Sequence, residues 1–252
     1  MSKTVNPSAA KAPKAPNVSP SAESEFNDTP YSLGPVWEVV VGYSLIEAAL
    51  WTAGDLRRAW SIATVIWIVG LIVYRGQSLR ELGLDRTVPL HSLWVIPAAA
   101  MISGAMLFGG HLAGTLHPYV VNRGFLSAAL AYLFWALQQE LMLQSFFFNR
   151  LERALGSGKA VWVAAGLFAL AHLPNPVLVP ATLIGGLVFC KLFQRYRNIY
   201  TLAVAQTILG ICFAAAVPNT VHHHMRVGIG YLTFSEVEVQ TRLSKIPAKI
   251  KE

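Results

Sequence analysis

The sequence predicts an all-α protein: a polytopic transmembrane bundle of about seven helices, one of them interrupted by proline. Three observations predict it. The chain is 54% hydrophobic and only 13% charged, whereas soluble domains carry about 25% charged residues. Long apolar stretches follow one another after a polar N-terminus, and a proline-rich segment ends one of them early. A chain of this kind is an integral membrane protein rather than a soluble one.

The first 34 residues differ from the rest. They are rich in Ala, Pro and Ser with mixed charge, and such a segment buries too little apolar surface to fold. We therefore expect a disordered tail over residues 1–34, a transmembrane domain over 35–217 and a C-terminal tail over 218–252.

The transmembrane domain contains seven apolar stretches. A full crossing takes about 20 residues of helix, and several stretches are shorter, which predicts thin or tilted spans. The stretches lie near 36–54, 59–74, 92–110, 125–148, 160–173, 177–194 and 199–217.

The fifth stretch is the interrupted one. AVWVAAGLFALAHL runs into LPNPVLVP, where Pro174 and Pro176 end the helix before it can cross. Irregular backbone at that depth survives only against protein or a water-filled cavity. His172 lies at this break, so the sequence indicates a cavity beside it.

The loop charges predict an orientation. One face collects the larger set of basic residues, and by the positive-inside rule that face, shared with the N-terminus, is cytoplasmic. We expect the cell (inner or plasma) membrane. The C-terminal tail is also basic, although an odd span count places it outside, so the count is wrong by one or the tail folds back. The basic residues of the predicted cytoplasmic face are Arg75, Arg80, Arg86, Arg150, Arg153, Lys159, Lys191, Arg195 and Arg197; Arg57, Arg58 and Arg123 lie on the other.

The same composition limits the classes of binding partner that we expect. The net charge is +7, but no basic stretch interleaves with aromatic residues outside the apolar runs, so nucleic-acid binding is not expected. We expect contact with membrane lipid and with a membrane-embedded protein or peptide substrate. The sequence leaves the oligomeric state open.

Polar residues inside the apolar stretches mark the candidate site, because such residues are costly in hydrocarbon. Measured along their helices from the predicted cytoplasmic face, Glu140, His172 and Gln206 lie about 15, 20 and 12 Å deep. Three helices therefore bring polar groups to a similar depth from one side, which predicts a shared wet pocket.

Two readings of these residues are possible. A glutamate and a histidine facing a wet cavity can activate water for attack on a carbonyl, with Glu140 taking the proton and His172 orienting or polarising. Gln144 shares a face with Glu140, and Gln139 is rotated about 100° away. Alternatively these groups are interhelical hydrogen-bond partners, worth about 0.6 kcal/mol on average.

The chain resembles the CPBP family, the intramembrane proteases related to type II CAAX prenyl proteases and abortive-infection proteins. QELMLQSFFFNRL (139–151) follows the frame of the family's first motif, EExxxR, and FALAH (168–172) matches the second, FxxxH. RNIYTLAVAQTILG (197–210) occupies the place of the third, HxxxN or HxxxD, and LRELGL (79–84) resembles a phrase found before the next span. The resemblance covers roughly residues 75 to 212 and implies the family's fold and an endopeptidase.

The motifs are degenerate here. The first Glu of the pair, usually assigned as the water-activating residue, is Gln139, and the Arg position is Gln144. The third-motif His and its partner are Gln206 and Gly210. Glutamine cannot act as a general base.

The replaced motif residues change which cofactor and which mechanism the resemblance implies. The resemblance implies a divalent metal such as zinc held by one Glu and two His, of which Glu140 and His172 remain. If the chain cuts, Glu140 activates water, His172 stabilises the developing charge, and Gln139 and Gln206 donate oxyanion hydrogen bonds. The alternative is a catalytically inactive pseudo-protease that binds a membrane partner as a chaperone or assembly factor.

Two further groups are weaker candidates. His222, His223 and His224 follow the last stretch, but adjacent histidines point in different directions, so we expect a polar interfacial loop followed by a short strand. Glu47 is a second intramembrane carboxylate, which faces the bundle or pairs with Arg57 or Arg58.

Overall fold

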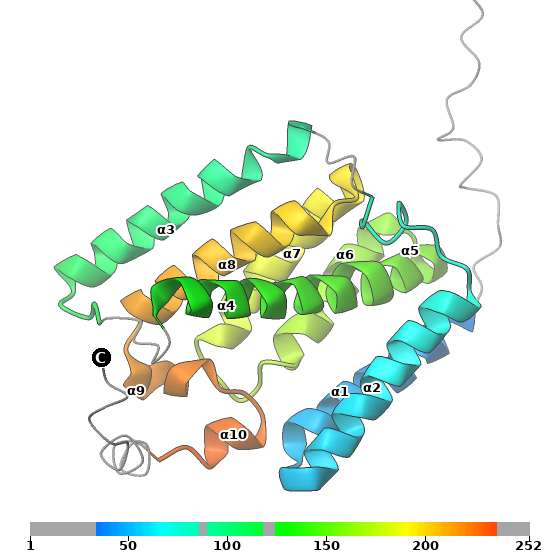
Figure 1. Cartoon of the computed structure of the whole chain (residues 1–252), viewed down its shortest axis with the longest axis horizontal. Helices are drawn as coiled ribbons and strands as arrows, with labels where there is room; N and C mark the ends of the chain where they lie inside the picture. The colour runs from blue at the N-terminus through cyan, green and yellow to red at the C-terminus, as the bar shows by residue number, and fades with distance from the viewer. Residues whose placement is uncertain (1–33, 86–89, 118–123, 236–252) are drawn as a thin grey trace, which may run out of the picture. The chain divides into compact units, whose positions relative to one another are not determined.

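Seven long helical elements make up most of the described chain (Figure 1). The computed structural model describes residues 34–85, 90–117 and 124–235. Each predicted apolar stretch forms helix, and the described residues contain no strand. The predicted tail of residues 1–34 lies outside them, apart from Gly34. The elements are α1 (Gly34–Trp51), α2 (Gly54–Tyr74), α3 (Val95–Leu112), α4 (Phe125–Glu140) continuing through η2 (Leu141–Phe148) into α5 (Asn149–Leu155), α6 (Ser157–Leu170), α7 (Leu178–Tyr196) and α8 (Ile199–Ala216), with a short turn η1 (Leu90–Ser92) before α3.

The proline interruption is confirmed. Helix α6 ends at Leu170, a turn follows, and α7 begins at Leu178. Asn175, fully buried, caps α7: its Oδ1 accepts hydrogen bonds from the backbone N–H groups of Val177 (3.2 Å) and Leu178 (3.0 Å). The short α6 packs along α7 as a helical hairpin, and His172 lies in the turn that joins them.

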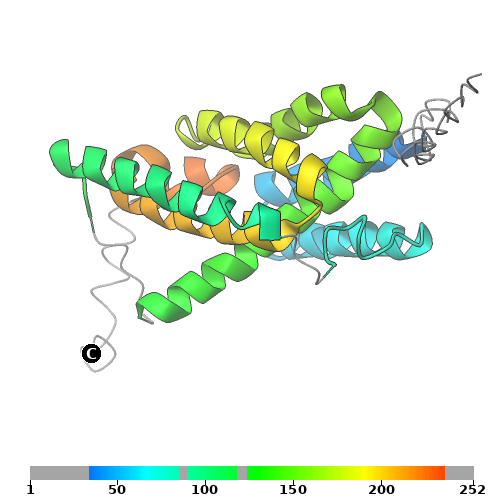
Figure 2. The ribbon, with the colours of Figure 1, turned by 90° about the horizontal axis from the view of Figure 1, so that it is seen from above.

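The helices pack in sequential and crossing pairs. Helix α1 packs against α2, and α8 lies between α3 and α4, as Figures 1 and 2 both show. Helix α1 also contacts α5. Phe146, Phe148 and Phe193 are fully buried at the centre of the apolar core. The first-motif segment therefore passes through the middle of the bundle.

The middle of that segment is a π-helix, η2. A π-helix has i→i+5 hydrogen bonds and a wider turn, is rare, and is found frequently at functional sites. Ser145 and Gln144, both in η2, are fully buried. The widened turn thus carries polar side chains into the core directly after Glu140.

Four described helices are long and apolar enough to cross a membrane: α2, α3, α7 and α8. Many of their large hydrophobic side chains are exposed, as a lipid-facing surface requires; on α2 these include Ile62, Val65, Ile66 and Val69. Apolar helices of this length with exposed hydrophobic side chains are those of an integral membrane protein. The total of about seven spans remains a prediction.

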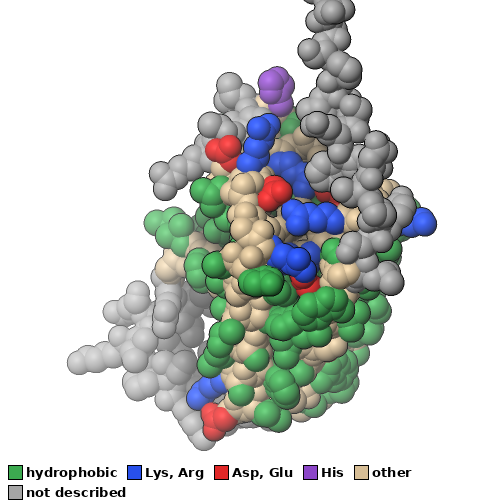
Figure 3. Space-filling model, turned by 90° about the vertical axis from the view of Figure 1, so that its right-hand side faces the viewer, with side chains coloured by type: hydrophobic (Ala, Val, Ile, Leu, Met, Phe, Trp, Pro, Cys, Tyr) green, Lys and Arg blue, Asp and Glu red, His purple; other side chains and the backbone are tan. Residues whose placement is uncertain are grey.

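Most charged side chains on the face drawn in Figure 3 gather in its upper half, and hydrophobic side chains cover most of the lower half, apart from one basic and one acidic side chain at the bottom. The ion pairs of Arg75, Arg150, Arg153 and Arg197 come from segments that the loop charges grouped on one face. Which side of the membrane this end faces remains a prediction.

The C-terminal segment differs from the prediction. The short strand expected after the histidines is wrong: residues Asn219–His222 form α9, His223–Met225 form η3, and Ile229–Leu232 form α10. Helix α10 packs against α1. The segment therefore folds back onto the bundle, which was one of the two possibilities raised by its charge.

Candidate functional site

A cavity of about 130 Å³ lies between α1, the α4–η2 segment, α6 and the turn that holds His172. Its walls are mainly apolar, and Gln139 and His172 are the two lining residues that the sequence predicted for the site. The remaining lining residues are Tyr43, Ile46, Leu50, Trp135, Met142, Leu143, Phe147, Ala164, Leu167, Phe168, Ala171 and Val227.

Gln139 connects the cavity to α8. The Nε2 group of Gln206 donates a hydrogen bond to Oε1 of Gln139 over 2.6 Å. The Nε2 group of Gln139 makes no hydrogen bond within the described residues and remains available as a donor. Helices α4 and α8, whose polar residues were predicted to lie at a similar depth, therefore meet beside the cavity through a hydrogen bond between two amides.

His172 is oriented by its own helix. Its Nδ1 lies 2.7 Å from the carbonyl oxygen of Phe168, one turn earlier, and the Phe168 ring packs edge-on against the imidazole at 4.8 Å. A carbonyl only accepts, so Nδ1 carries the proton and Nε2 of the neutral ring is an acceptor. Of the lining residues that the sequence predicted, Gln139 therefore offers a donor and His172 an acceptor; Tyr43 and Trp135, which also carry polar groups, line the cavity too.

Glu140 does not line the cavity. Its side chain is buried beside Gln144 and close to the thiol of Cys190 on α7. Oε2 of Glu140 and both amide atoms of Gln144 are buried with no hydrogen-bond partner in the described part of the chain. The structure brings Gln139 and His172 to one cavity, with Gln206 bonded to Gln139. The predicted shared pocket of Glu140, His172 and Gln206 is not what it shows, because Glu140 and Gln144 lie on a different side of the same segment.

The space beside Gly210, at the third-motif position, is filled by a side chain from another helix. A Cβ atom on Gly210 would lie 2.0 Å from the hydroxyl oxygen of Tyr132 on α4. Gly210 is one turn beyond Gln206, so the same face of α8 meets α4 at both points. The tyrosine occupies the space that a larger residue at 210 would need, and the motif pattern alone gave no sign of this.

Glu47 lies beside Tyr43, a lining residue, but is not itself in the lining. Its Oε2 accepts a hydrogen bond from Nε1 of Trp51 over 2.9 Å. The predicted pairing with Arg57 or Arg58 is wrong. Arg58 pairs with Asp55, and Nε of Arg57 donates to the carbonyl of Thr52.

The histidine triplet does not converge on one point. His222 is buried, donates from Nε2 to the carbonyl of Val217 and accepts at Nδ1 from the backbone N–H of Met225. His223 stacks on Tyr231 with ring centroids 4.1 Å apart. These contacts hold the returning segment in place.

The donor set does not fit the metal that the resemblance implies. Among the described residues no group of three or more His, Cys, Asp or Glu side chains is placed to hold an ion. Gln139 and Gln206 are amides, and Glu140 faces away from His172's cavity. The described residues therefore do not form the metal site of one Glu and two His that the resemblance implies.

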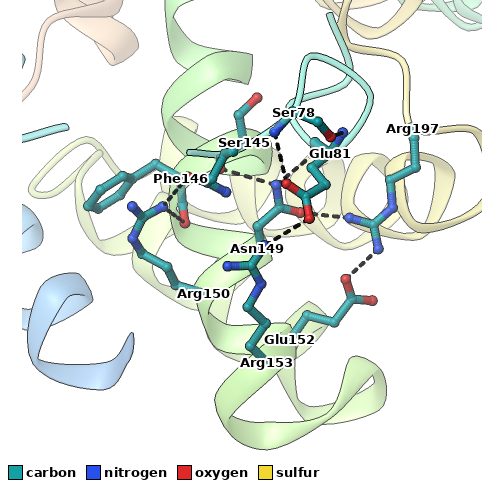
Figure 4. Close-up of polar contacts among 10 residues, drawn as sticks. Ser78, Glu81, Ser145, Phe146, Asn149, Arg150, Glu152, Arg153 and Arg197 are labelled. Carbon is teal, nitrogen blue, oxygen red and sulfur yellow. Dashed lines mark hydrogen bonds and ion pairs between the residues drawn. The ribbon is translucent and has the colours of Figure 1, made fainter. Parts of the chain in front are cut away.

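A second polar cluster lies at the charged end of the same segment (Figure 4). Ser145 Oγ donates to the carbonyl of Leu82 over 2.6 Å, and Nδ2 of Asn149 donates to the carbonyl of Glu81 over 2.8 Å. Arg197 donates to Oδ1 of Asn149 and pairs with Glu152. The hydrogen bonds of this cluster hold the LRELGL segment (79–84) against η2 and α5.

Comparison with known proteins agrees with the motif pattern. The family model described as type II CAAX prenyl endopeptidase Rce1-like matches residues 121–212. The matched region contains Gln139, Glu140, His172, Gln206 and Gly210, and it confirms the resemblance to the CPBP family over this part of the chain. Comparison with curated proteins gives no match, and comparison with solved structures gives none either.

Proposed function

We propose that this chain is a CPBP-like membrane protein that binds a hydrophobic segment of a membrane-embedded partner in the cavity of Gln139 and His172, without cleaving it. The observation that carries the proposal is the identity of the cavity-facing residue: Gln139 faces the cavity, and its neighbour Glu140 does not. Among the described lining residues there is no Asp or Glu. An amide cannot take a proton from water at neutral pH, and the one imidazole in the lining, His172, has no carboxylate beside it in the cavity.

The same geometry supports binding. A peptide group presents one acceptor, its carbonyl, and one donor, its N–H. Nε2 of Gln139 and Nε2 of His172 supply the matching donor and acceptor, and the apolar walls suit hydrophobic side chains. Polar groups buried with a partner in the bilayer need such matching, because an unsatisfied amide is costly there.

Photo-crosslinking in the native membrane tests binding. A photoreactive residue in place of Met142, which lines the cavity, is compared with one in place of Phe134, which is on the same segment and exposed. We expect a discrete protein adduct from position 142 alone, lost when Ala164→Phe fills the cavity. Adducts of equal yield from both positions would contradict the proposal.

A cleavage assay in proteoliposomes separates binding from peptidase activity. The captured partner is incubated with the wild-type chain, Glu140→Gln and His172→Ala. We expect no cleavage by any of the three and continued capture by Glu140→Gln. Cleavage by the wild type that Glu140→Gln abolishes would establish the endopeptidase instead, with Glu140 turning into the cavity during the reaction.

A further inference from the structure

The segment Arg226–Leu232, here called the strap, crosses the space between α1 and the turn that holds His172. Its helix α10 packs on α1, and Val227 lines the cavity. The backbone N–H of Gly228 donates to the carbonyl of Leu173 over 2.7 Å. The strap thus contacts both α1 and the His172 turn, the two walls of the cavity that lie furthest apart in the sequence.

The strap is held by its backbone. Nδ2 of Asn175 donates to the carbonyl of Arg226 over 3.1 Å and to that of His222 over 2.9 Å. Arg226 has extended dihedrals, φ −78° and ψ 153°. The carbonyl of residue 226 and the N–H of residue 228 are both bonded to the His172 turn, while the residue between them lines the cavity.

This alternation resembles that of an added β-strand, in which every second residue pairs with the receptor and the intervening side chain enters a pocket. The extended conformation holds at Arg226 and ends at Gly228, whose φ is positive. Leu173 supplies the acceptor and Asn175 the donor. Neither contact reads a side chain of the strap, so the two groups recognise any extended backbone that fits.

The fit is demanding at one position. Gly228 has φ +56°, and a Cβ atom there would lie 2.2 Å from the carbonyl oxygen of Leu50. A bound segment therefore needs glycine directly after the residue that enters the cavity.

The connection to the strap is strained. His223, His224 and Met225 are consecutive non-glycine residues with φ of 47°, 53° and 57°. Such left-handed residues cost of order 1–2 kcal/mol each and persist only when surrounding contacts hold them. Release of the strap from Leu173 and Asn175 would relieve this strain, which offsets part of the loss of contacts.

We propose that Leu173 and Asn175 form a binding site for an extended peptide backbone, and that the strap is its built-in occupant. The inference rests on the proposed function: the membrane partner reaches the cavity by displacing Arg226–Gly228 and presenting an extended segment with a small apolar residue followed by glycine. The strap then acts as an internal competitor that sets the affinity for the partner.

The test uses the strap itself as the probe. A fluorescent peptide with the sequence of residues 225–233, MRVGIGYLT, is titrated against three detergent-purified proteins: the full chain, the chain ending at Met225, and full-length Gly228→Val. A tethered occupant acts at millimolar effective concentration. For a peptide that binds the open site with a Kd of about 10 μM, we therefore expect the full chain to bind it about 100-fold more weakly than the truncated chain.

Two substitutions, one in the protein and one in the peptide, allow the test to be read even if the truncated chain does not fold. In Gly228→Val the added side chain meets Leu50 and expels the strap, so this full-length protein should also bind the peptide even if the truncated chain fails to fold. A peptide with valine at the glycine position should bind neither. Failure of both opened proteins to bind the peptide, or equal binding of the valine peptide, would overturn the inference.

The outcome is separable from that of the proposed function. Partner adducts at position 142 with no peptide binding would leave the partner-binding proposal standing without the strap. Peptide binding with no partner adduct would support the backbone site and contradict the proposed function.

Discussion

The buried charges at the charged end of the bundle have ion-pair partners, and the buried carboxyl in its middle has none among the described residues. At the end, Glu38 is 2% exposed and pairs with both Arg75 and Arg150, and Nη1 of Arg150 also donates to Gln77 and to the carbonyl of Phe146. In the middle, Oε2 of Glu140, both amide atoms of Gln144 and Oε1 of Gln206 are buried without hydrogen-bond partners in the described chain. At the charged end Nη2 of Arg150 and Nε2 of Gln77 also lack a partner, but both residues are held by other bonds.

The difference separates two roles. Polar groups that are paired across α1, α2 and α5 fix how these elements dock, and breaking one pair leaves a charge buried alone. Polar groups without partners stabilise little by themselves and remain open to water, a ligand or a changed rotamer. The end of the bundle therefore supports the fold, and the middle is where function is expected.

The largest expected effect is at Glu38. Glu38→Gln leaves Arg150, with a side chain 3% exposed, without its counter-charge, and removing one member of a buried pair costs about 3–5 kcal/mol. Chemical unfolding in detergent micelles measures the loss. The control is Arg153→Ala, whose pair with Glu81 is exposed and is worth less than about 1 kcal/mol. Equal losses would remove the distinction between paired core and exposed surface.

A smaller loss is expected where α8 meets α4. Gly210→Ala forces the added Cβ against Tyr132, and such overpacking costs about 1–3 kcal/mol. In a Tyr132→Ala background the same substitution should cost clearly less, so a double-mutant cycle gives a coupling energy. Gly109→Ala on α3, with nothing within 4 Å of the added atom, is the matched control. Additive effects at 132 and 210 would contradict the contact.

Glu140→Gln should act in the opposite direction to Glu38→Gln. The carboxyl of Glu140 has no counter-charge among the described residues, so an uncharged isostere keeps the shape without a desolvation cost. We expect the free energy of unfolding to stay equal or to rise by about 1 kcal/mol. A loss as large as that of Glu38→Gln would mean that Glu140 has a structural partner.

The smallest effect is a pH dependence at the returning segment. Burial lowers the pKa of His222, whereas in the unfolded chain it takes a proton near pH 6.5. The unfolded state then binds more protons below about pH 6.5, so stability falls as the pH falls through that value. Protonation of Nδ1 would also remove the bond from Met225.

Thermal unfolding at about pH 7.5 and 5.5 measures this effect, and His222→Gln should reduce the decrease between the two values. His111→Gln, at an exposed residue, should not change it. An identical decrease in wild type and His222→Gln would assign the pH dependence to other groups.

Much of the fold could be predicted from the sequence because hydrophobic stretches and proline act locally. The seven apolar stretches and the end of α6 before Pro174 required no tertiary information. The approach of α4 and α8 at a similar depth followed from residues counted along the helices, although the count was made for Glu140 and the bond to Gln206 comes from Gln139. The rotation of the first-motif helix could not be predicted in this way. Adjacent residues on a helix differ by about 100°, and Gln138, Gln139 and Glu140 follow one another, so polarity alone does not say which of them faces the cavity.

Other features depend on long-range contacts that no local pattern encodes. The strap is held by Asn175, some 50 residues earlier in the chain, and Tyr132 fills the space at Gly210 from a separate helix. The π-helical turn lies where Ser145 and its neighbours meet the LRELGL segment. The signal that existed was the glycine at 228 among apolar residues, which marks a close backbone approach.

The central claim is that Gln139, and not Glu140, faces the cavity, and cysteine labelling tests it most directly. Gln139→Cys and Glu140→Cys are made in a chain whose native Cys190 and Cys212 are replaced by serine, and each is exposed to a small membrane-permeant thiol reagent. We expect rapid modification at position 139, slowed when Ala164→Phe fills the cavity, and little modification at position 140. Rapid modification at 140 with protection at 139 would contradict the account.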